Sequence, residues 1–553
     1  MDGISAARNN MNVFQPKFFR TIRDYSGKKL VSDIVAGIIV AIIALPLSIA
    51  LAIASGVSPE KGLYTAIVAG FVISFLGGSS VNISGPTAAF ATIVAGIVAQ
   101  KGMSGLIIAT VLAGIFLILM GVLKLGSLIQ YIPYTITVGF TAGIAVTIVV
   151  GQLKDFVGLT YPAGTTAVET MEKLDVFAHN IGTFNPWAFL VGTVSLAILI
   201  VWPYISRKIP GSLIAIIAAV LMVKLLKLPV NTIGDLYTIS SALPTPILPA
   251  LSFSAITDAI PDAFTIAILA AIESLLSCVV ADGMIGAKHN SNMELIAQGV
   301  GNIGSVLFGG IPATGAIART AANIKNGGRS PIAGMVHAVV LLLVLVVLMP
   351  YAALIPMPTI AAILLMVAYN MSEWRHFVHL CRTSPIGDIA VLVLTFLLTV
   401  IFDLVVAIEA GLILTLIFFV KREKEISSFR EWEEADHLHN TSKQIPANAS
   451  VYELNGPLFF GASQHISAIS ARGGKNCLIL RMKGVTSVDT SGLRGLESLF
   501  VSCEKAGVTL ILSHLNDQPT EILTHAGFLE KVGADNVCPN IDAALARAEA
   551  LKK

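Results

Sequence analysis

Long apolar runs separated by short polar connections dominate the chain up to residue 420. Each run approaches the length of about 20 residues that a helix needs to cross a bilayer, and we place about fourteen such spans between residues 33 and 420. After residue 430 the pattern changes to short alternating runs. Strands are expected at 450–456, 477–484 and 509–515, and helices near 463–471, 491–506, 517–526 and 541–552. The pattern predicts an all-α polytopic membrane domain followed by a small α/β domain.

The shift in composition gives the expected domain boundaries. Residues 1–32 form a basic segment without the features of a secretory signal peptide, 33–422 the membrane domain, 423–445 a charged linker and 446–553 the α/β domain. If the N-terminus is cytoplasmic, the loops richest in Lys and Arg are cytoplasmic too, as expected for membrane proteins. This predicts a multi-pass protein of the cytoplasmic membrane with both termini in the cytoplasm. Only 13% of the 553 residues are charged and the net charge is +2, which gives no indication of nucleic-acid binding.

Two predicted spans, at 84–99 and 314–325, are short and interrupted by glycine and proline. They lie in "FLGGSSVNISGPTAAFATIVAG" (75–96) and "LFGGIPATGAIARTAANIKNGG" (307–328). Each takes the third place in a set of about seven spans, at about 33–227 and 259–420, which would run in opposite orientations. A matched pair of broken segments points to the central binding site of a transporter. The alternative is that Gly and Pro only kink packed helices.

A helix that begins in mid-membrane leaves its first N–H groups unpaired, and an anion can satisfy them. Proline suits the first turn of such a helix and glycine lets a ligand approach the backbone closely. The half-helix starts that we expect are Gly85, Pro86, Pro312, Thr314 and Gly315. Thr87 and Thr314 would add hydroxyl donors and Arg319 a full positive charge. The pattern therefore predicts a positively polarised anion pocket between two helix N-termini.

Few other ionisable residues fall inside the predicted spans. Glu273, in "TIAILAAIESLLSCVVADG" (265–283), lies near the middle of its span, and intramembrane charges are functional by default. It could be protonated reversibly during transport, ligate Na⁺, or simply neutralise Arg319. Asp33, Asp403 and Glu409 lie near span ends, where we expect solvated or snorkelling positions.

Several segments resemble the bacterial sulfate permease (SulP) family of anion transporters, which carries a C-terminal STAS domain. The segments are "ALPLSIALAIASGVSPEKGLYTAIVAG" (44–70), "ISGPTAAF" (83–90), "ESLLSCVVADGMIGAKHNSNMELIAQGVGNI" (273–303), "GAIARTAANIKNGGRSPIAGMVH" (315–337) and, for STAS, "VTSVDTSGL" (485–493). The resemblance implies two intertwined inverted repeats of seven spans, divided into core and gate domains, in a homodimer. It also implies that the core moves like an elevator and carries an anion between the third and tenth helices.

The resemblance also assigns site residues. The implied anion pocket consists of Thr87, Ala88, Ile317, Ala318 and Arg319, with Ser48 and Leu51 of the first span facing it. Many relatives have a hydroxyl residue where Ala318 stands, so any role there falls to its backbone N–H. Glu273 matches an acidic position linked to cation coupling, and a Glu favours H⁺ over Na⁺ as the coupling ion. No other cofactor and no metal site are expected.

The resemblance implies a secondary active transporter rather than an enzyme, for sulfate, bicarbonate or C4-dicarboxylates. The last class is suggested by "GPTAAF" and "NMSEW". A nucleobase symporter of the same architecture and an anion sensor that signals through STAS are the alternatives. Asp489, Thr490 and Ser491 either form a helix N-cap or, as similarity to anti-sigma-factor antagonists implies, a regulatory site with a phosphate-accepting Ser491. A cytoplasmic protein partner at STAS would fit the second interpretation.

Overall fold

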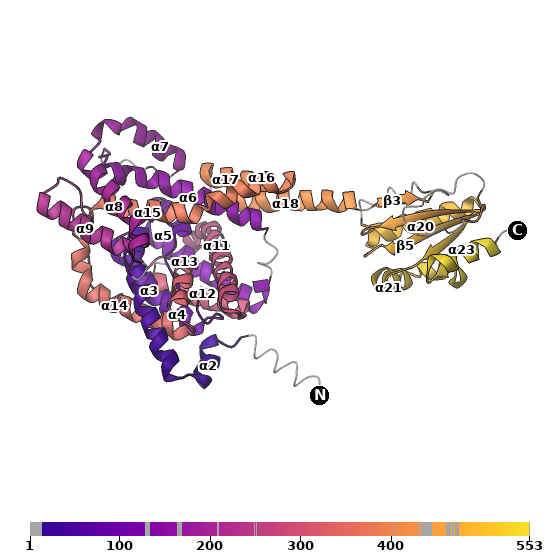
Figure 1. Ribbon diagram of the computed structural model, residues 1–553, viewed down its shortest axis with the longest axis horizontal. Coiled ribbons are helices and arrows are strands. Elements are labelled where there is room, and N and C mark those ends of the chain that lie inside the picture. The colour runs from indigo at the N-terminus through magenta and orange to yellow at the C-terminus, as the bar shows by residue number, and fades with distance from the viewer. Residues whose placement is uncertain are drawn as a thin grey trace. The chain divides into compact units, whose positions relative to one another are not determined.

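The computed structural model describes residues 14–127, 133–162, 167, 169–206, 209–247, 249, 252–402, 404–426, 428–432, 445–459, 466, 469 and 475–551. It divides into two compact units, Met1–Ile413 and Leu414–Lys553. Figure 1 shows the helical first unit and, in the second, a sheet with helices. The helices up to the second unit are α2 (Lys17–Thr21), α3 (Gly27–Ala54), α4 (Pro59–Leu76), α5 (Ala88–Val122), α6 (Tyr134–Val157), α7 (Thr170–His179), α8 (Pro186–Ile205), α9 (Gly211–Leu226), α10 (Ile233–Leu236), α11 (Phe253–Ile285), α12 (Ser291–Leu307), α13 (Ile317–Lys325), α14 (Pro331–Ala352), α15 (Met357–Ser372), α16 (Trp374–Thr383), α17 (Ile386–Ile401) and α18 (Leu404–Ile426).

Most of these helices are apolar enough for a membrane. Within the described ranges, 7 helices have the length and composition to cross one: α3, α4, α5, α6, α8, α11 and α14. The helices α9 and α17 are apolar but shorter. Helix α5 is interrupted at Gly102, whose φ of 67° is left-handed, so it contains parts of two predicted spans. The number of crossings stays a prediction.

The helix boundaries follow from residues at their ends. The side chains of Ser26, Ser252 and Asn290 accept backbone N–H groups in the first turns of α3, α11 and α12. Prolines occupy the first turns of α4, α8, α14 and α15, where the missing N–H is harmless. Helices α6 and α11 end at the left-handed glycines Gly158 and Gly286.

The membrane helices pack in two groups, and each group takes helices from both halves of the chain. In the first, α12 packs on α4 and α5, α14 on α3 and α4, and α11 on α5 and α13. In the second, α6 packs on α15 and α17, and α8 on α9 and α15. The short helix α13 packs on α11 and also on α3, which precedes it by more than two hundred residues, so the two halves of the chain interdigitate.

The second unit is a mixed five-stranded sheet in the order β3-β4-β5-β6-β7. Its strands are β3 (Ser428–Glu431), β4 (Ala449–Asn455), β5 (Cys477–Gly484), β6 (Thr509–Ser513) and β7 (Val537–Cys538), and its helices are α20 (Thr490–Lys505), α21 (Asp517–His525), α22 (Phe528–Val532) and α23 (Ile541–Ala550). Only β3 is antiparallel to its neighbour among these strands. The three predicted strands and the last three predicted helices are confirmed, whereas the edge strands β3 and β7 were missed. The predicted helix at 463–471 falls almost wholly outside the described residues.

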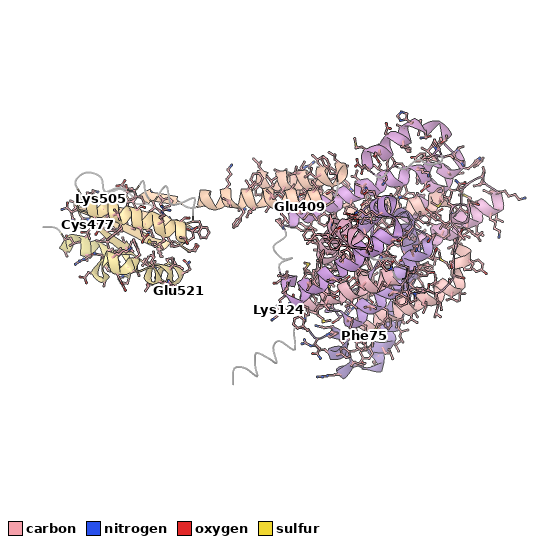
Figure 2. All side chains as sticks on the ribbon, turned by 180° about the vertical axis from the view of Figure 1, so that it is seen from behind. Phe75, Lys124, Glu409, Cys477, Lys505 and Glu521 are labelled. Atoms are coloured by element: carbon pink, nitrogen blue, oxygen red, sulfur yellow. The ribbon has the colours of Figure 1, made fainter. Side chains whose placement is uncertain are left out.

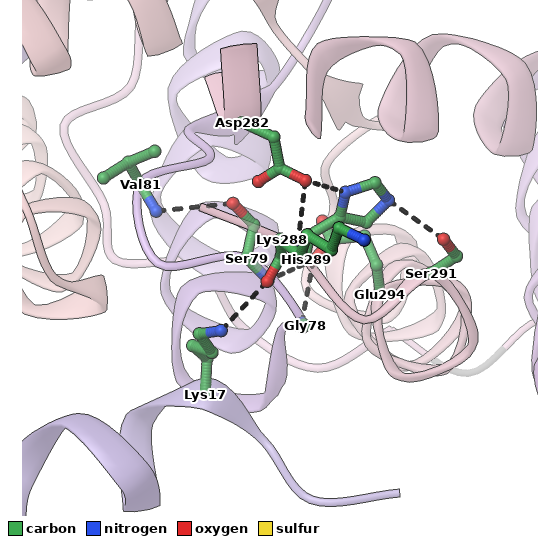
Figure 3. Close-up of polar contacts among 9 residues, drawn as sticks. All are labelled: Lys17, Gly78, Ser79, Val81, Asp282, Lys288, His289, Ser291 and Glu294. Atoms are coloured by element: carbon green, nitrogen blue, oxygen red, sulfur yellow. Dashed lines mark hydrogen bonds and ion pairs between the residues drawn. The ribbon is translucent and has the colours of Figure 1, made fainter. Parts of the chain in front are cut away.

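The N-terminal helix α2 is fastened to the ends of two other elements. The backbone N–H of Lys17 donates to the Gly77 carbonyl (2.9 Å), and its Nζ donates to the Lys288 carbonyl (3.0 Å; Figure 3). Beside these bonds, Phe18 packs on Phe75 of α4, with ring centroids 5.0 Å apart. Figure 2 labels Phe75. Helix α2 therefore belongs to the first helix group.

The prediction that Asp33 is solvated is wrong. It is fully buried and accepts hydrogen bonds from the backbone N–H groups of Arg329 (2.7 Å) and Ser330 (3.2 Å) and from the Tyr25 hydroxyl (2.6 Å). Folding brings the Arg329 and Ser330 N–H groups to it from the start of α14, and these bonds stabilise the carboxylate in its buried position. Of the other two acids, Glu409 is exposed as expected, and Asp403 lies outside the described residues.

Candidate functional site

The two Gly/Pro-interrupted segments meet in a small sheet. Strands β1 (Ser84–Gly85) and β2 (Thr314–Gly315) pair antiparallel and are completely enclosed by the first helix group. The Ala316 N–H extends the pairing by donating to the Ile83 carbonyl (2.8 Å). Segments more than two hundred residues apart are thus joined through their backbones in the part of the chain where we predicted the site.

The helices begin later than predicted. Helix α5 begins at Ala88 and α13 at Ile317, so the prediction of helix starts at Pro86 and Pro312 is wrong. Three other predicted starts lie in the strands: Gly85 in β1, and Thr314 and Gly315 in β2. The backbone N–H and C=O groups at these positions bond across the strand pair. In a helix that started earlier, the same groups would have bonded along the helix instead. Each helix nevertheless begins directly beyond the strand pair.

Both helix N-termini lack a side-chain cap. The N-cap residues are Thr87 for α5 and Ala316 for α13, and neither supplies a capping hydrogen bond. Thr87 is partly exposed, and Ile317 and Ala318 are exposed, although they lie beside buried strands. First-turn N–H groups without a capping side chain carry the partial positive charge of a helix N-terminus. These two ends can accept an anionic ligand.

Glu273 connects the two segments. Its Oε2 accepts hydrogen bonds from the hydroxyls of Thr314 (2.8 Å) and Thr87 (3.0 Å), and these two hydroxyl oxygens lie 3.2 Å apart. The next residue, Ser274, accepts the Gly315 N–H through its Oγ (3.0 Å). The middle of α11 is therefore bound to both segments, and a proton on Glu273 would change the charge next to both helix ends.

Arg319 is directed toward the backbone of the other segment. Its side chain is 1% exposed, and its Nη2 donates to the Pro86 carbonyl (2.9 Å). Its Nε and Nη1 have no hydrogen-bond partner in the described part of the chain. Among the ion pairs of the described residues, none joins Arg319 to Glu273. The structure therefore lacks the direct ion pair between Arg319 and Glu273 that the sequence left open. Within the described residues, no acidic side chain contacts the guanidinium to balance its charge.

Ser48 and Leu51 of α3 are both buried. The Ser48 hydroxyl has no hydrogen-bond partner within the described ranges, and α4 packs so closely that a Cβ on Gly62 would overlap the Ser48 carbonyl. None of the hydrogen bonds at the strand pair comes from these two residues. Their orientation toward an anion stays a prediction.

A polar stripe on α12, which we did not assign, supports the first segment. Glu294 is 1% exposed and accepts hydrogen bonds from the backbone N–H groups of Gly78 (2.9 Å) and Ser79 (3.2 Å) and from Asn82 Nδ2 (2.8 Å). Figure 3 shows Glu294 beside Gly78 and the ion pair of Asp282 with His289 (2.7 Å). The carboxylate thus fixes the chain that leads into β1.

The second segment is supported from the same stripe by a neutral side chain. Asn302 accepts the Ala313 N–H (2.8 Å) and donates to the Ala313 carbonyl (2.9 Å), and Thr65 of α4 accepts the Ile311 N–H (2.7 Å). Glu294, Gln298 and Asn302 recur every four residues in α12, and Leu295, Ile296, Ala297 and Val300 lie between them. This spacing, read as a polar face in a membrane span, could have revealed these residues from the sequence.

The chain offers little to a metal ion. No group of three or more His, Cys, Asp or Glu side chains that could hold one occurs in the described ranges. At the strand pair, the oxygen donors are the Glu273 carboxylate and the hydroxyls of Thr87 and Thr314, which already bond to one another. The site as built is a cluster of hydroxyls, helix ends and one carboxylate.

In the second unit, Asp489 is confirmed as a helix cap. Its Oδ1 accepts the Gly492 N–H (2.7 Å) at the start of α20. Thr490 is exposed, but Ser491 is only partly exposed, because it lies inside the first helical turn rather than before it. A phosphate on Ser491 and a protein partner at this unit stay predictions.

Comparison with known proteins agrees with this architecture. The profile of the sulfate permease family matches residues 30–395, and the STAS domain profile matches residues 440–544. This chain belongs to the sulfate permease family. It is 41% identical over 529 residues to a Bacillus subtilis (strain 168) protein named "Putative sulfate transporter YvdB", covering 94% of this chain and 97% of that one. It is 31% identical over 479 residues to the bicarbonate transporter BicA of Picosynechococcus sp., covering 83% and 82%.

Solved structures show the same fold. The transmembrane domain of a cyanobacterial bicarbonate transporter BicA aligns with a TM-score of 0.64 at 30% identity, over 69% of this chain and 98% of that one. The overall structure of SLC26A9 aligns with a TM-score of 0.86 at 21% identity, over 99% and 94%. The predicted fold class, a multi-pass helical membrane domain followed by a STAS domain, is confirmed. The named relatives of this sulfate permease family member are transporters and not enzymes.

Proposed function

We propose that this chain is a secondary active transporter that carries a small anion across the cytoplasmic membrane. The observation that supports this most is the pair of uncapped helix N-termini, α5 and α13, directly beyond the buried β1–β2 pair. An anion between them would receive backbone N–H groups from Ala88, Ile317 and Ala318. Contributions of about 0.3–2 kcal/mol for each helix terminus are modest, which suits a carrier that must release its substrate.

Arg319 would contribute long-range positive potential rather than a direct contact. Its guanidinium is buried, has two nitrogens without hydrogen-bond partners in the described residues, and is held by the Pro86 carbonyl. Charge in a low-dielectric interior acts over longer distances than in water. The same bond fixes the first segment relative to α13, so Arg319 would also position the two helix ends.

Glu273 would couple anion transport to protons. When it is ionised, its carboxylate accepts both threonine hydroxyls and cancels positive charge near the helix ends. When it is protonated, the pocket is net positive and attracts an anion more strongly. Uptake should therefore rise as the external pH falls. H⁺ suits this arrangement better than Na⁺, because the surrounding hydroxyls already bond to the carboxylate.

Alternating access would follow from motion of one helix group against the other. The strand pair, α11, α12 and α14 belong to the first group, which we equate with the core, and α6, α8, α15 and α17 to the second, the gate. We further propose that the chain forms a homodimer, that its domains span 33–422 and 446–553, and that both termini are cytoplasmic.

The topology can be tested by labelling intact cells with an impermeant thiol reagent. In a chain whose native cysteines are replaced, a single cysteine at position 169 should be labelled and one at position 421 should not. The reverse result would invert the topology.

The substrate is a small oxyanion or dicarboxylate. The relatives named above are called sulfate and bicarbonate transporters, and the segments "GPTAAF" and "NMSEW" keep C4-dicarboxylates in the panel. Purified protein in proteoliposomes should take up labelled sulfate, bicarbonate or succinate, faster with an inward proton gradient. No flux with any anion, together with anion binding, would favour the sensor, and flux of a nucleobase instead would favour the nucleobase symporter.

The coupling role has a matched control on the same helix. Glu273→Gln should bind the anion but lose the pH dependence of uptake. Asp262→Asn removes another carboxylate of α11, one that pairs with Lys101 (2.5 Å) away from the strand pair, and should keep that dependence. Equal pH profiles in wild type and Glu273→Gln would remove the proton-coupling role.

A further inference from the structure

Helix α16 separates its basic and apolar residues onto two faces. Arg375, His379 and Arg382 recur at intervals of four and three residues, which places them along one side of the helix. The opposite side carries Phe377, which packs against Phe396 of α17 with ring centroids 5.3 Å apart. No residue of α16 is buried, so the basic side is open.

The connections of α16 confine it to the end of two membrane helices. A single residue, Glu373, joins it to α15, and two residues, Ser384 and Pro385, join it to α17. Glu373 has a φ of 41°, a left-handed conformation that turns the chain sharply. With such short connections, α16 is held at the end of α15 and the start of α17, and it would lie at the level of the lipid headgroups if these two helices cross the membrane.

Aromatic side chains mark the same level. Trp374 of α16 is 48% exposed, Tyr369 of α15 is 53% exposed, and Tyr134, the first residue of α6, is 54% exposed. Tyr134 packs against His376 of α16, with ring centroids 5.5 Å apart. Exposed Trp and Tyr gather at membrane–water interfaces, where the ring is buried in lipid and its polar edge is hydrated.

Within the described residues, the two arginines of this face have no acidic partner. In the described ranges, neither Arg375 nor Arg382 forms an ion pair, although Glu373 and Asp388 lie on the adjoining segments. The Arg375 guanidinium lies over the Trp374 ring, 5.6 Å from its centroid. Two uncompensated guanidinium groups beside an interfacial tryptophan match the charge and depth of a phospholipid phosphate.

We propose that the basic face of α16 (Arg375, His379 and Arg382) binds the headgroups of anionic phospholipids. Arg375 and Arg382 pair with the phosphates, and Trp374 and Val378, which is 36% exposed, contact the upper acyl chains. Because α16 joins α15 to α17 in the second helix group, the lipid would anchor that group at the membrane surface. The site is separate from the β1–β2 pair, so it stands or falls independently of the anion pocket.

Photo-cross-linking reads the local lipid directly. The full chain, with p-benzoylphenylalanine at Val378, is reconstituted in vesicles of equal parts phosphatidylglycerol and phosphatidylcholine, irradiated, and the attached lipid is identified by mass spectrometry. We expect phosphatidylglycerol to exceed phosphatidylcholine several-fold. Arg375→Gln with Arg382→Gln should bring the ratio close to one, because these two residues supply the positive charge that favours the anionic headgroup.

The control removes two exposed positive charges elsewhere. Lys224→Gln with Lys227→Gln, at the end of α9, should leave the ratio unchanged. High salt should lower the ratio in the protein that keeps both arginines, which tests the proposal without an arginine substitution. Three results would overturn the proposal. They are equal cross-linking to both lipids, cross-linking to the chain's own second unit, and loss of the preference when inorganic phosphate is added at constant ionic strength.

Discussion

The two segments that meet at β1 and β2 resemble each other in sequence but are held by different chemistry. The chain before β1 is fixed by a buried carboxylate, Glu294, which accepts two backbone N–H groups and one amide. The chain before β2 is fixed by the neutral groups of Asn302 and Thr65. A charged acceptor forms stronger hydrogen bonds than a neutral one. The first segment is therefore the more firmly anchored of the two.

The helix ends differ as well. Ala88 at the start of α5 is 7% exposed, whereas Ile317 at the start of α13 is 40% exposed. Only the second helix carries an arginine in its first turn, and Arg319 reaches across to the Pro86 carbonyl of the first. The comparison indicates a division of roles, in which the first segment is the fixed wall of the site and the second supplies the open face and the charge.

Replacing the two anchors gives the largest expected effect. Glu294→Ala leaves several buried donors unpaired, each at about 1–3 kcal/mol, and should lower stability by several kcal/mol. Asn302→Ala leaves one N–H and one carbonyl unpaired and should cost less. Thermal unfolding of the purified protein in detergent measures both. Glu294→Gln, which keeps the shape, should fall between wild type and Glu294→Ala. Equal losses for the two alanine variants would contradict the difference in anchoring.

Arg319 tests the charge that only the second segment carries. Arg319→Ala should weaken anion binding by about tenfold, because the pocket loses about 1.4 kcal/mol of electrostatic attraction from the buried charge. Arg319→Lys keeps the charge but not the forked geometry, so it should recover much of the affinity. Calorimetry with the best transported anion measures this in detergent. Unchanged affinity in Arg319→Ala would remove the electrostatic role, and equal losses in both variants would assign the effect to the bond with Pro86.

The two threonines should separate structure from selectivity. Thr314 is fully buried and Thr87 partly exposed, although both hydroxyls donate to Glu273. Thr314→Val should lower stability by about 1–3 kcal/mol through the polar groups it leaves unpaired. Thr87→Val should change the relative affinity for sulfate, bicarbonate and succinate more than it changes stability. A panel of binding and unfolding measurements decides this, and identical profiles for the two variants would contradict the assignment.

The smallest expected effect concerns a helix that does have a cap. Asp489→Ala should destabilise the second unit by about 1 kcal/mol, the usual cost of losing an N-cap. Ser491→Ala should leave its stability unchanged, since no hydrogen bond of the described residues depends on that hydroxyl. Trp432 lies in this unit, so its fluorescence in a full chain whose other three tryptophans are replaced by phenylalanine reports on the unit's unfolding. If Ser491→Asp changes transport while Ser491→Ala does not, a regulatory role for charge at this turn gains support.

Much of the site could be located from the sequence, because its signals are local. Gly and Pro in the middle of apolar runs identified both segments, and an acidic residue in mid-span identified Glu273. The helix starts were misplaced, because whether Pro86 and Pro312 open a helix depends on whether the neighbouring residues find a strand partner. That partner lies more than two hundred residues away.

The amino-acid sequence alone was enough to predict a helical membrane domain, an α/β domain after it and the family, since these follow from hydropathy, composition and motifs that each lie within one stretch of chain. Only the tertiary structure decided what each polar residue touches. It turned Arg319 toward Pro86 rather than Glu273, buried Asp33 against the start of α14, and revealed Glu294 as an anchor. In a nearly dry interior a buried polar group must find its hydrogen-bond partner wherever folding provides one. Those partners are set by which helices pack together, which no local pattern specifies.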